Sequence, residues 1–288
     1  MKRKDVVIER FAPSPTGYLH LGHAFSALTA YNKAKKSLGI LKLRIEDIDN
    51  NRCKKKFERQ IFKDLHWLGI KWSEPVLKQS NRRHIYNKTL YDLKNKGLIY
   101  KCNCSRKDIK NALSAPHRSD RRTTVYPGTC LNKHLNDDFV SLRLNMRKAL
   151  QTISSRRLEF IETGYNNKKS VFQRRVDPEE LLTNFGDIVI ARKDIGTSYN
   201  LAVVVDDAMQ GITHVTRGED LFEITPIQIL LQNLLDIQTP IYHHHKLILD
   251  SFGNRLAKRS YSESLLSLRE KGMDQIQIFE LISSDKFF

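Results

Sequence analysis

The stretch from Arg10 to His23, R-F-A-P-S-P-T-G-Y-L-H-L-G-H, constrains the fold of this chain more than any other. The β-branched run Val6–Ile8 before it predicts a buried strand of a parallel sheet, with Arg10 at its carboxyl end. The prolines and the glycine that follow favour neither a strand nor a helix, so the chain must turn there. From His20 to Lys36 apolar residues recur at helical spacing. The sequence therefore predicts a strand, a tight loop and a helix, the opening unit of an α/β sheet.

The start of this helix is suited to hold phosphate. A helix that follows the first parallel strand presents unpaired N–H groups and the positive end of its dipole, and Gly22 leaves room for a ligand. By itself, H-L-G-H is short enough to recur by chance, and its histidines could serve only capping and packing.

The fourteen-residue string as a whole resembles the signature of the class I glutamyl-type aminoacyl-tRNA synthetases. In that family two histidines stabilise the charge that develops on phosphate when ATP is attacked. The resemblance implies that His20 and His23 are catalytic and that Gly22 binds ATP beside them. It also implies a glutamate-binding set made of Arg10, Phe11, Ala12, Pro13 and Ser14.

Composition agrees with a globular protein that binds a polyanion. The chain has 288 residues, of which 40% are hydrophobic, enough for one large α/β domain or two smaller ones. No run of about eighteen apolar residues and no cleavable signal occurs, so we expect a cytoplasmic protein. The net charge of +17 favours a polyanionic partner, although a lysine-rich genome gives the same excess. Arginine pairs such as Arg156-Arg157 and Arg174-Arg175 suit phosphate, and a solvated face is the alternative.

A second predicted strand, I-L-K-L-R-I, ends at Glu46. The ligand crevice of an open parallel sheet lies beyond the carboxyl ends of its strands, so Arg10 and Glu46 are expected to face one molecule, and their opposite charges suit an amino acid. The string resembles the family's L-R-I-E-D-T-D-x-x-R, in which the glutamate holds the amino group of the substrate; Ile48 replaces the threonine. Helix capping by Asp49 is the alternative and is compatible with this role.

A cysteine-rich region predicts a metal site. Thiols stay reduced in the cytoplasm and bind zinc tightly, but C-x-C is an unusually tight spacing and tyrosine is an uncommon ligand, so composition leaves the question open. The resemblance favours zinc, because some family members carry C-x-C and then Y-x₃-C as a structural zinc site in an insertion that contacts the tRNA acceptor arm. The implied ligands of one Zn²⁺ are Cys102, Cys104, Tyr126 and Cys130, although the segment between Cys104 and Tyr126 is longer than expected.

The later part of the chain adds two glutamate contacts. The string Y-N-L-A-V-V-V-D-D from Tyr199 resembles a family motif whose tyrosine touches the substrate side chain, and its valines predict a buried strand or helix. Arg217 follows another predicted strand, and the family match assigns it to the substrate. Two arginines, Arg10 and Arg217, with Glu46 match the two carboxylates and one ammonium of glutamate. Unpaired, these charges would be costly to bury.

Two further motifs lie near the end. The string R-L-A-K-R resembles the K-M-S-K-S loop, which implies that Lys258 reaches the phosphates of ATP, accompanied by Mg²⁺. Arg255 and Ala257 depart from that pattern, and the lost hydroxyl at Ala257 predicts slower catalysis. A metal site at His243–His245 is not favoured, because no carboxylate or cysteine joins these histidines at ligand spacing.

Together these motifs predict an α/β fold: a Rossmann-type class I synthetase catalytic domain with an inserted zinc-bearing subdomain of the acceptor-arm type and a short C-terminal helical segment. We expect the first half of the catalytic domain at 1–101, the insertion at 102–186 and the second half at 187–240. The K-M-S-K-S-like loop and the helical segment occupy 241–288.

Little chain follows Lys258, whereas a full glutamyl-tRNA synthetase continues into an anticodon-reading domain. The resemblance therefore implies a short family member that activates L-glutamate with ATP without tRNA and transfers it to queuosine at the wobble position of tRNA(Asp). A truncated synthetase that charges the 3′ end and a non-catalytic, zinc-bearing RNA-binding paralogue are the alternatives. The expected partners are this tRNA, ATP and L-glutamate. We expect no membrane contact, and a monomer.

Overall fold

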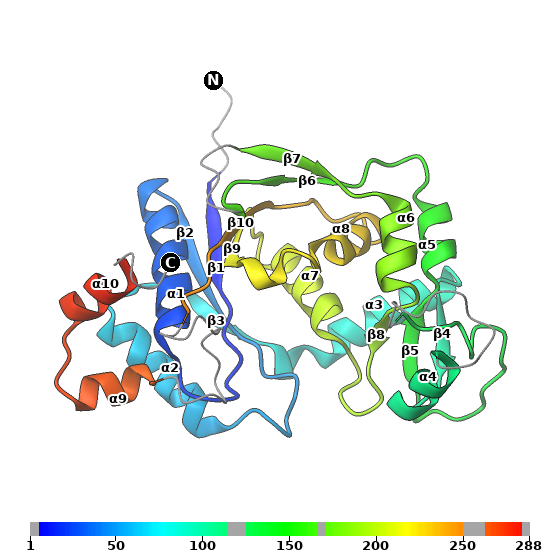
Figure 1. The fold of residues 1–288 in the computed structure, drawn as a ribbon, viewed down its shortest axis with the longest axis horizontal. Coiled ribbons are helices and arrows are strands. Elements are labelled where there is room, and N and C mark those ends of the chain that lie inside the picture. The colour runs from blue at the N-terminus through cyan, green and yellow to red at the C-terminus, as the bar shows by residue number, and fades with distance from the viewer. Residues whose placement is uncertain (1–5, 114–124, 166–170, 250–262, 284–288) are drawn as a thin grey trace.

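A computed structural model describes residues 6–113, 125–165, 171–249 and 263–283 (Figure 1). Lys258, Arg255 and Ala257 of the K-M-S-K-S-like loop lie outside these described residues. None of the described helices combines the length and the apolar character that a membrane-crossing segment requires.

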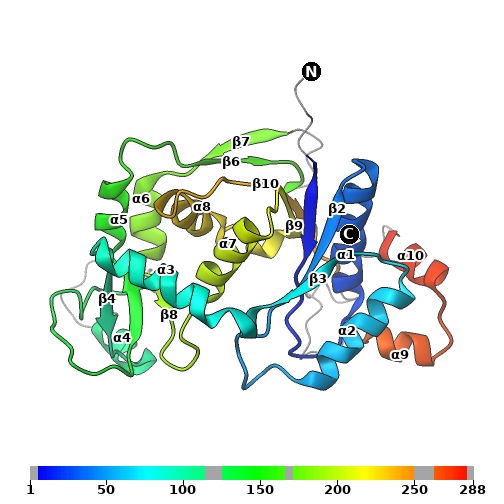
Figure 2. The same cartoon turned by 180° about the vertical axis from the view of Figure 1, so that it is seen from behind.

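Parallel strands form the centre of the molecule. The strands β1 (Ile8–Phe11), β2 (Ile40–Ile45) and β3 (Ser73–Lys78) pair in that order, and β9 (His214–Gly218) pairs in parallel with β10 (Ile241–His245). The backbone N–H of Thr213 donates to the carbonyl of Ile8 at 3.0 Å, which places β9 beside β1 (Figures 1 and 2). In the order β3-β2-β1-β9-β10, the earlier strands lie on one side of β1 and the later strands on its other side, so the topological switch point is between β1 and β9. Such a switch point is where open α/β sheets bind ligands.

The first strand is displaced from its predicted position. We expected it at Val6–Ile8, but it begins at Ile8 and ends at Phe11, and Val6 is 53% exposed. The sheet sets this boundary, because Ile8 is the first residue of β1 paired with β2, opposite Ile40. Glu9 and Arg10 consequently occupy buried strand positions, which no apolar pattern indicates.

The helices of the first half are close to their predicted bounds. The helix α1 (Leu21–Lys36) buries four alanines, and these small side chains let it pack closely on β1, β2 and β9. Apolar residues at helical spacing in the sequence also predict helices at 54–68 and 82–96. The structure confirms them as α2 (Lys55–Trp67) and α3 (Arg83–Asn95). Each differs from its predicted bounds by one residue at either end.

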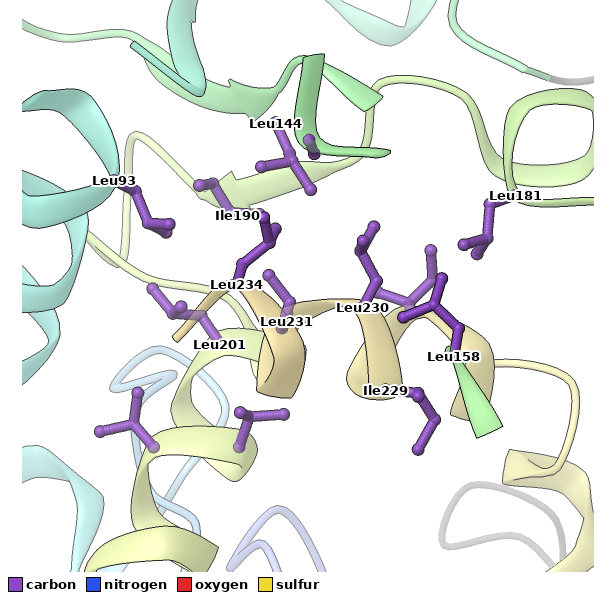
Figure 3. Close-up of a cluster of buried hydrophobic side chains, with 14 of the residues drawn as sticks. Leu93, Leu144, Leu158, Leu181, Ile190, Leu201, Ile229, Leu230, Leu231 and Leu234 are labelled. Carbon is purple, nitrogen blue, oxygen red and sulfur yellow. The ribbon is translucent and has the colours of Figure 1, made fainter. Parts of the chain in front are cut away.

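The largest core joins segments that are distant in sequence. The helices α7 (Tyr199–Met209) and α8 (Thr225–Leu234) are apolar over most of their surface, so they must be covered on several sides. Figure 3 shows the side chains of α8 packed among residues from α3, from α7 and from two strands that lie between α3 and α7 in the sequence. The labelled residues are Leu93, Leu144, Leu158, Leu181, Ile190, Leu201, Ile229, Leu230, Leu231 and Leu234.

Two further groups of strands cross the expected domain borders. The strands β4 (Ile99–Cys102), β5 (Ser141–Leu144) and β8 (Val189–Ala191) form an antiparallel sheet beside α4 (Arg106–Leu113) and α5 (Met146–Thr152). The hairpin of β6 (Glu159–Glu162) and β7 (Phe172–Arg175) joins β10 in the order β7-β6-β10-β9. Hydrogen-bonded sheets thus span the borders at 101/102 and 186/187, and the borders themselves stay a prediction.

Short helices complete the chain. The helix α6 (Pro178–Glu180) begins with Asp177 as its N-cap and continues into the turn Leu181–Phe185. The helices α9 (Leu265–Glu270) and α10 (Gln275–Ser283) lie where the C-terminal helical segment is expected. The helix α9 packs on α2 and α10 packs on α1, at the opposite end of the molecule from α5 (Figure 1).

Candidate active site

A cavity of about 660 Å³ opens at the switch point, beyond the carboxyl ends of β1, β2, β9 and β10. With the exception of Lys258, which is outside the described residues, every residue that the sequence assigned to glutamate or ATP lines this cavity. They are Arg10, Phe11, Ala12, Pro13, Ser14, His20, Gly22, His23, Glu46, Tyr199 and Arg217. The fold thus gathers residues from four separate segments into one space.

The two histidines are locked at the start of α1. The Nδ1 atom of His20 accepts from the backbone N–H of Gly22 at 3.1 Å, and Nδ1 of His23 accepts from the N–H of His20 at 3.2 Å. A neutral imidazole has one N–H, so each ring carries its proton on Nε2. A side chain at Gly22 would place its Cβ 3.1 Å from the His20 ring, and glycine allows this close approach. The histidines do cap the helix, and capping fixes them as Nε2 donors.

A buried charge network supports the side of the cavity that Arg10 and Glu46 line. Arg44, whose side chain is fully buried, bonds to Asp207 at 2.6 Å and to Glu46 at 3.1 Å. Arg10 donates from Nη1 to the carbonyl of Thr216 at 2.9 Å, and its Nε lies 3.5 Å from Asp207. Burial raises the pKa of Glu46, while the positive charge of Arg44 acts to lower it. A ligand ammonium beside Glu46 would favour the ionised carboxylate further.

Arg217 is held by neutral acceptors, three of them at 2.9 Å or less and a fourth, the Leu221 carbonyl, at 3.4 Å. Its Nε donates to Nε2 of His244 at 2.9 Å, its Nη1 to Gln228 at 2.8 Å and its Nη2 to Thr225 at 2.7 Å. His244 in turn lies 2.5 Å from a carboxylate oxygen of Glu162. This chain of contacts fixes the guanidinium at the cavity wall.

The two aspartates at the end of V-V-V-D-D, Asp206 and Asp207, have different hydrogen-bond partners. Asp207 serves the buried arginines, whereas Asp206 accepts from Arg82 at 2.6 Å, Tyr86 at 2.7 Å and Gln79 at 2.9 Å. These contacts tie the C-terminal half of α7 to α3 and its preceding turn. Tyr199 is the first residue of this helix, and burial raises the pKa of its phenol, which therefore stays protonated.

Sequence reasoning missed four supporting residues: Arg44, Asp207, His244 and Glu162. Arg44 and Asp207 had a usable signal, because a charged residue inside an apolar run must find a partner when it is buried. His244 was considered only as part of a metal site, and the three-histidine run forms no metal-ligand group among the described residues. Glu162 had no local signal, since its partner is brought to it by the pairing of β6 with β10.

The cysteine region does bring its predicted ligands together. The sulfurs of Cys102, Cys104 and Cys130 all lie within 4.8 Å of one another, and the Tyr126 hydroxyl is 3.4 Å and 3.5 Å from the first two. Tetrahedral zinc with Zn–S bonds of 2.3 Å needs sulfurs about 3.8 Å apart. Burial opposes ionisation of Cys130, but hydrogen bonds, chiefly from Tyr126, lower its pKa to about 7. These residues could hold a metal ion.

Comparison with known proteins identifies the family. The family model of the class I tRNA synthetases (E and Q), catalytic domain, matches residues 6–283. The chain belongs to this family. The glutamyl-Q tRNA(Asp) synthetase of Rhodobacter capsulatus is 46% identical over 279 residues, which are 96% of this chain and 99% of that protein. The protein of the same name from Prochlorococcus marinus (strain MIT 9313) is 37% identical over 264 residues, 92% of this chain and 76% of that protein. The family resemblance inferred from the sequence is confirmed.

Solved structures support the fold. A glutamate tRNA ligase from Elizabethkingia meningosepticum, crystallised in complex with its amino acid, superposes with a TM-score of 0.75 at 23% identity. The match covers 97% of this chain, which spans about 60% of the length of that ligase. A putative arginyl-tRNA synthetase from Campylobacter jejuni gives a TM-score of 0.54. The expected α/β class I catalytic domain is therefore confirmed.

Proposed function

We propose that this chain activates L-glutamate with ATP and transfers it to queuosine at the wobble position of tRNA(Asp). The observation that carries the proposal is the single cavity in which glutamate-like charge complementarity lies next to the paired histidines of α1. Relatives at up to 46% identity that bear the name glutamyl-Q tRNA(Asp) synthetase support it.

Glutamate would be held by charge. Arg10 and Arg217 each offer a guanidinium to one of its carboxylates, and Glu46 accepts its ammonium group. Tyr199, neutral at physiological pH, would contact the side chain, and the backbone and side chains of residues 11–14 would close the pocket. Glutamine would leave one arginine without a carboxylate, which disfavours it.

Activation would occur beside the helix start. The α-carboxylate of glutamate attacks the α-phosphorus of ATP, an acyl phosphate bond forms, and pyrophosphate leaves. The Nε2–H groups of His20 and His23 would donate to the phosphate oxygens, and Gly22 would allow the phosphates close to the backbone. Lys258 would stabilise the pyrophosphate as a mobile positive charge, and Mg²⁺ bound to ATP would share this charge.

Transfer would use the same cavity. A hydroxyl of the queuosine cyclopentene-diol attacks the glutamyl carbonyl and loses its proton, the bond from the carbonyl carbon to the phosphate oxygen breaks, an ester forms, and AMP leaves with the bonding electrons. The two neighbouring hydroxyls of that diol resemble those of a terminal ribose, so one pocket suits this chemistry. The nucleotide must be splayed from its loop to reach the cavity. Basic residues of the insertion would contact the phosphates of the anticodon stem-loop.

Zinc would have a structural role. Cys102, Cys104, Tyr126 and Cys130 would enclose one Zn²⁺, which leaves no coordination position for a substrate. Cys102 ends β4 and the other ligands lie outside strands, so the metal would fix these connections to the sheet of the insertion. We propose that the enzyme works as a monomer in the cytoplasm, with tRNA, ATP and glutamate as its partners.

The deciding experiment is glutamate transfer to purified tRNA(Asp) with queuosine or with guanosine at the wobble position. We expect labelled glutamate on the queuosine tRNA alone, also after removal of its 3′ end. Binding should weaken steeply with salt, while selectivity for the modified nucleoside persists. Charging of unmodified tRNA(Glu) at its 3′ end, with no transfer to queuosine, would instead establish a truncated glutamyl-tRNA synthetase.

A further inference from the structure

Three buried side chains form a row that leads away from the glutamate pocket. Arg217 on β9, His244 on β10 and Glu162 on β6 lie on adjacent strands of one sheet and are 4%, 0% and 0% exposed (Figure 1). Arg217 and His244 are opposite each other in the β9–β10 register. Each side chain bonds to the next, at 2.9 Å between Arg217 and His244 and at 2.5 Å between His244 and Glu162.

The chemistry of the two ends fixes the proton on the ring between them. Arg217 can only donate, so Nε2 of His244 must be its unprotonated acceptor. The ring proton then lies on Nδ1 and is donated to Glu162. Burial lowers the pKa of His244 to about 4, so the ring is neutral at physiological pH and has this one tautomer.

Backbone hydrogen bonds fix the orientation of the Glu162 carboxylate. Its Oε1 accepts from four backbone N–H groups, those of Thr163, Gly164, Tyr165 and His244, at 2.7 to 3.1 Å. Only Oε2 faces the imidazole, and both oxygens must be acceptors. Burial opposes ionisation, but the hydrogen bonds from His244 and from backbone amides lower the pKa of Glu162 to about 2. The carboxylate is therefore charged and its orientation is fixed.

A spacer between the arginine and the carboxylate has a clear use. Among the described residues no carboxylate forms an ion pair with Arg217. A glutamate in direct contact would occupy the guanidinium as its counter-ion. The imidazole instead occupies only Nε of Arg217. Each Nη atom of Arg217 makes one short hydrogen bond, to Gln228 or to Thr225, and Nη2 has a further long contact of 3.4 Å with Leu221. The Nη atoms therefore retain N–H groups for a ligand.

We propose that Glu162 and His244 are positioning residues that orient Arg217 for one carboxylate of glutamate, an inference that rests on the proposed function of Arg217. The carboxylate fixes the tautomer of the imidazole, and the imidazole fixes the edge of the guanidinium. Specificity for glutamate thus depends on two residues that do not touch the substrate.

The decisive variant is Glu162→Gln, which preserves shape. The four backbone donors require the amide oxygen at the Oε1 position, so the amide NH₂ must face Nδ1 of His244. His244 must then carry its proton on Nε2, where it meets the N–H of Arg217. The new Nε2–H of His244 can reach Thr225 Oγ1, 3.3 Å away, but the Nε–H of Arg217 loses its acceptor. A buried donor without an acceptor costs about 1–3 kcal/mol, so we expect KM for glutamate to rise about 10- to 100-fold. KM for ATP should stay within about twofold, because the histidines of α1 are unchanged.

Nitrogen NMR of ¹⁵N-histidine-labelled protein reports the tautomer directly. In the wild type Nδ1 of His244 should carry the proton, and in Glu162→Gln the proton should move to Nε2. His244→Gln places an oxygen near the former Nε2 and should retain most of the glutamate affinity, whereas His244→Leu should lose it. Asp64→Asn is the matched control, because it neutralises a buried carboxylate of α2 that does not line the cavity.

The outcomes separate this proposal from the proposed function. Wild-type protein that binds ATP but shows no glutamate-dependent pyrophosphate exchange would refute the function, whatever the tautomer. Active wild-type protein with a folded Glu162→Gln variant of unchanged glutamate KM would overturn the positioning role. If that variant does not fold, equal glutamate KM values for His244→Gln and His244→Leu overturn the role, and a loss confined to His244→Leu supports it.

Discussion

Asp207 is the shared partner of two buried arginines, so Asp207→Asn tests the charge network behind the glutamate pocket. Its Oδ1 lies 2.6 Å from Nη1 of Arg44 and 3.5 Å from Nε of Arg10. The asparagine keeps an acceptor oxygen but removes the negative charge between two cations. Removal of one member of a buried ion pair costs about 3–5 kcal/mol. Arg44 retains its bond to Glu46, so we expect the lower end, about 3 kcal/mol.

This free energy converts into a measurable shift. Unfolding entropy of about 2.1 cal/mol/K per residue over 288 residues gives about 0.6 kcal/mol/K, so Tm should fall by about 5 °C. Glu46 becomes the main counter-charge of both arginines and attracts the substrate ammonium less. KM for glutamate in pyrophosphate exchange should therefore rise about tenfold, while KM for ATP changes little.

Asp236→Asn is the control for this experiment. Asp236 also pairs with an arginine, Arg156, but its side chain is 68% exposed. Because solvent and salt screen such an exposed pair, its loss should leave Tm nearly unchanged and both KM values unaltered. The reasoning is wrong if Asp207→Asn melts within a degree or so of the wild type and binds glutamate equally well, since the network would then carry neither stability nor substrate affinity.

Three further results are expected. The protein should hold one zinc per chain, and the Cys102→Ser and Cys130→Ser variants should lose it. Both variants should impair glutamate transfer more than adenylate formation. Elemental analysis that finds no zinc in carefully prepared wild-type protein would contradict the site. Lys258→Ala should reduce pyrophosphate exchange about 100-fold or more without unfolding, and near-normal exchange would exclude its role. Burial raises the pKa of Asp64 to about 6, so the folded state binds its proton more tightly and the free energy of unfolding falls as pH rises from about 4 to about 6. Asp64→Asn should consequently be more stable than the wild type by about 1–3 kcal/mol at pH 8 and no more stable at pH 4, and equal urea midpoints at pH 8 would contradict this.

The sequence alone determined the features whose causes are local. The turn residues after Arg10 and the helical spacing from His20 predict the loop and α1, because a cap, a turn and a period of 3.6 are properties of a few consecutive residues. The helices α2 and α3 follow from the same signals. Strand ends in the sequence also indicated Arg10, Glu46 and Arg217 as candidate cavity residues, since ligand sites of an open sheet lie there, and the resemblance to the synthetase family implied the others.

Only the tertiary structure decided which strands pair and which buried charges meet. The apolar run D-I-V-I-A-R at 187–192 predicts a strand but not its partner, and in the structure β8 pairs with β5 rather than with the parallel sheet. Arg44 meets Asp207 across 163 positions, and Glu162 meets His244 across 82. A charged residue predicted to be buried must have a partner, but the sequence does not show which residue that partner is. The partner depends on chain crossovers that are fixed by burial of the whole core. The residues proposed to contact the ligand could therefore be found in the sequence, whereas the pairing of the residues that hold them in place became evident only in the folded chain.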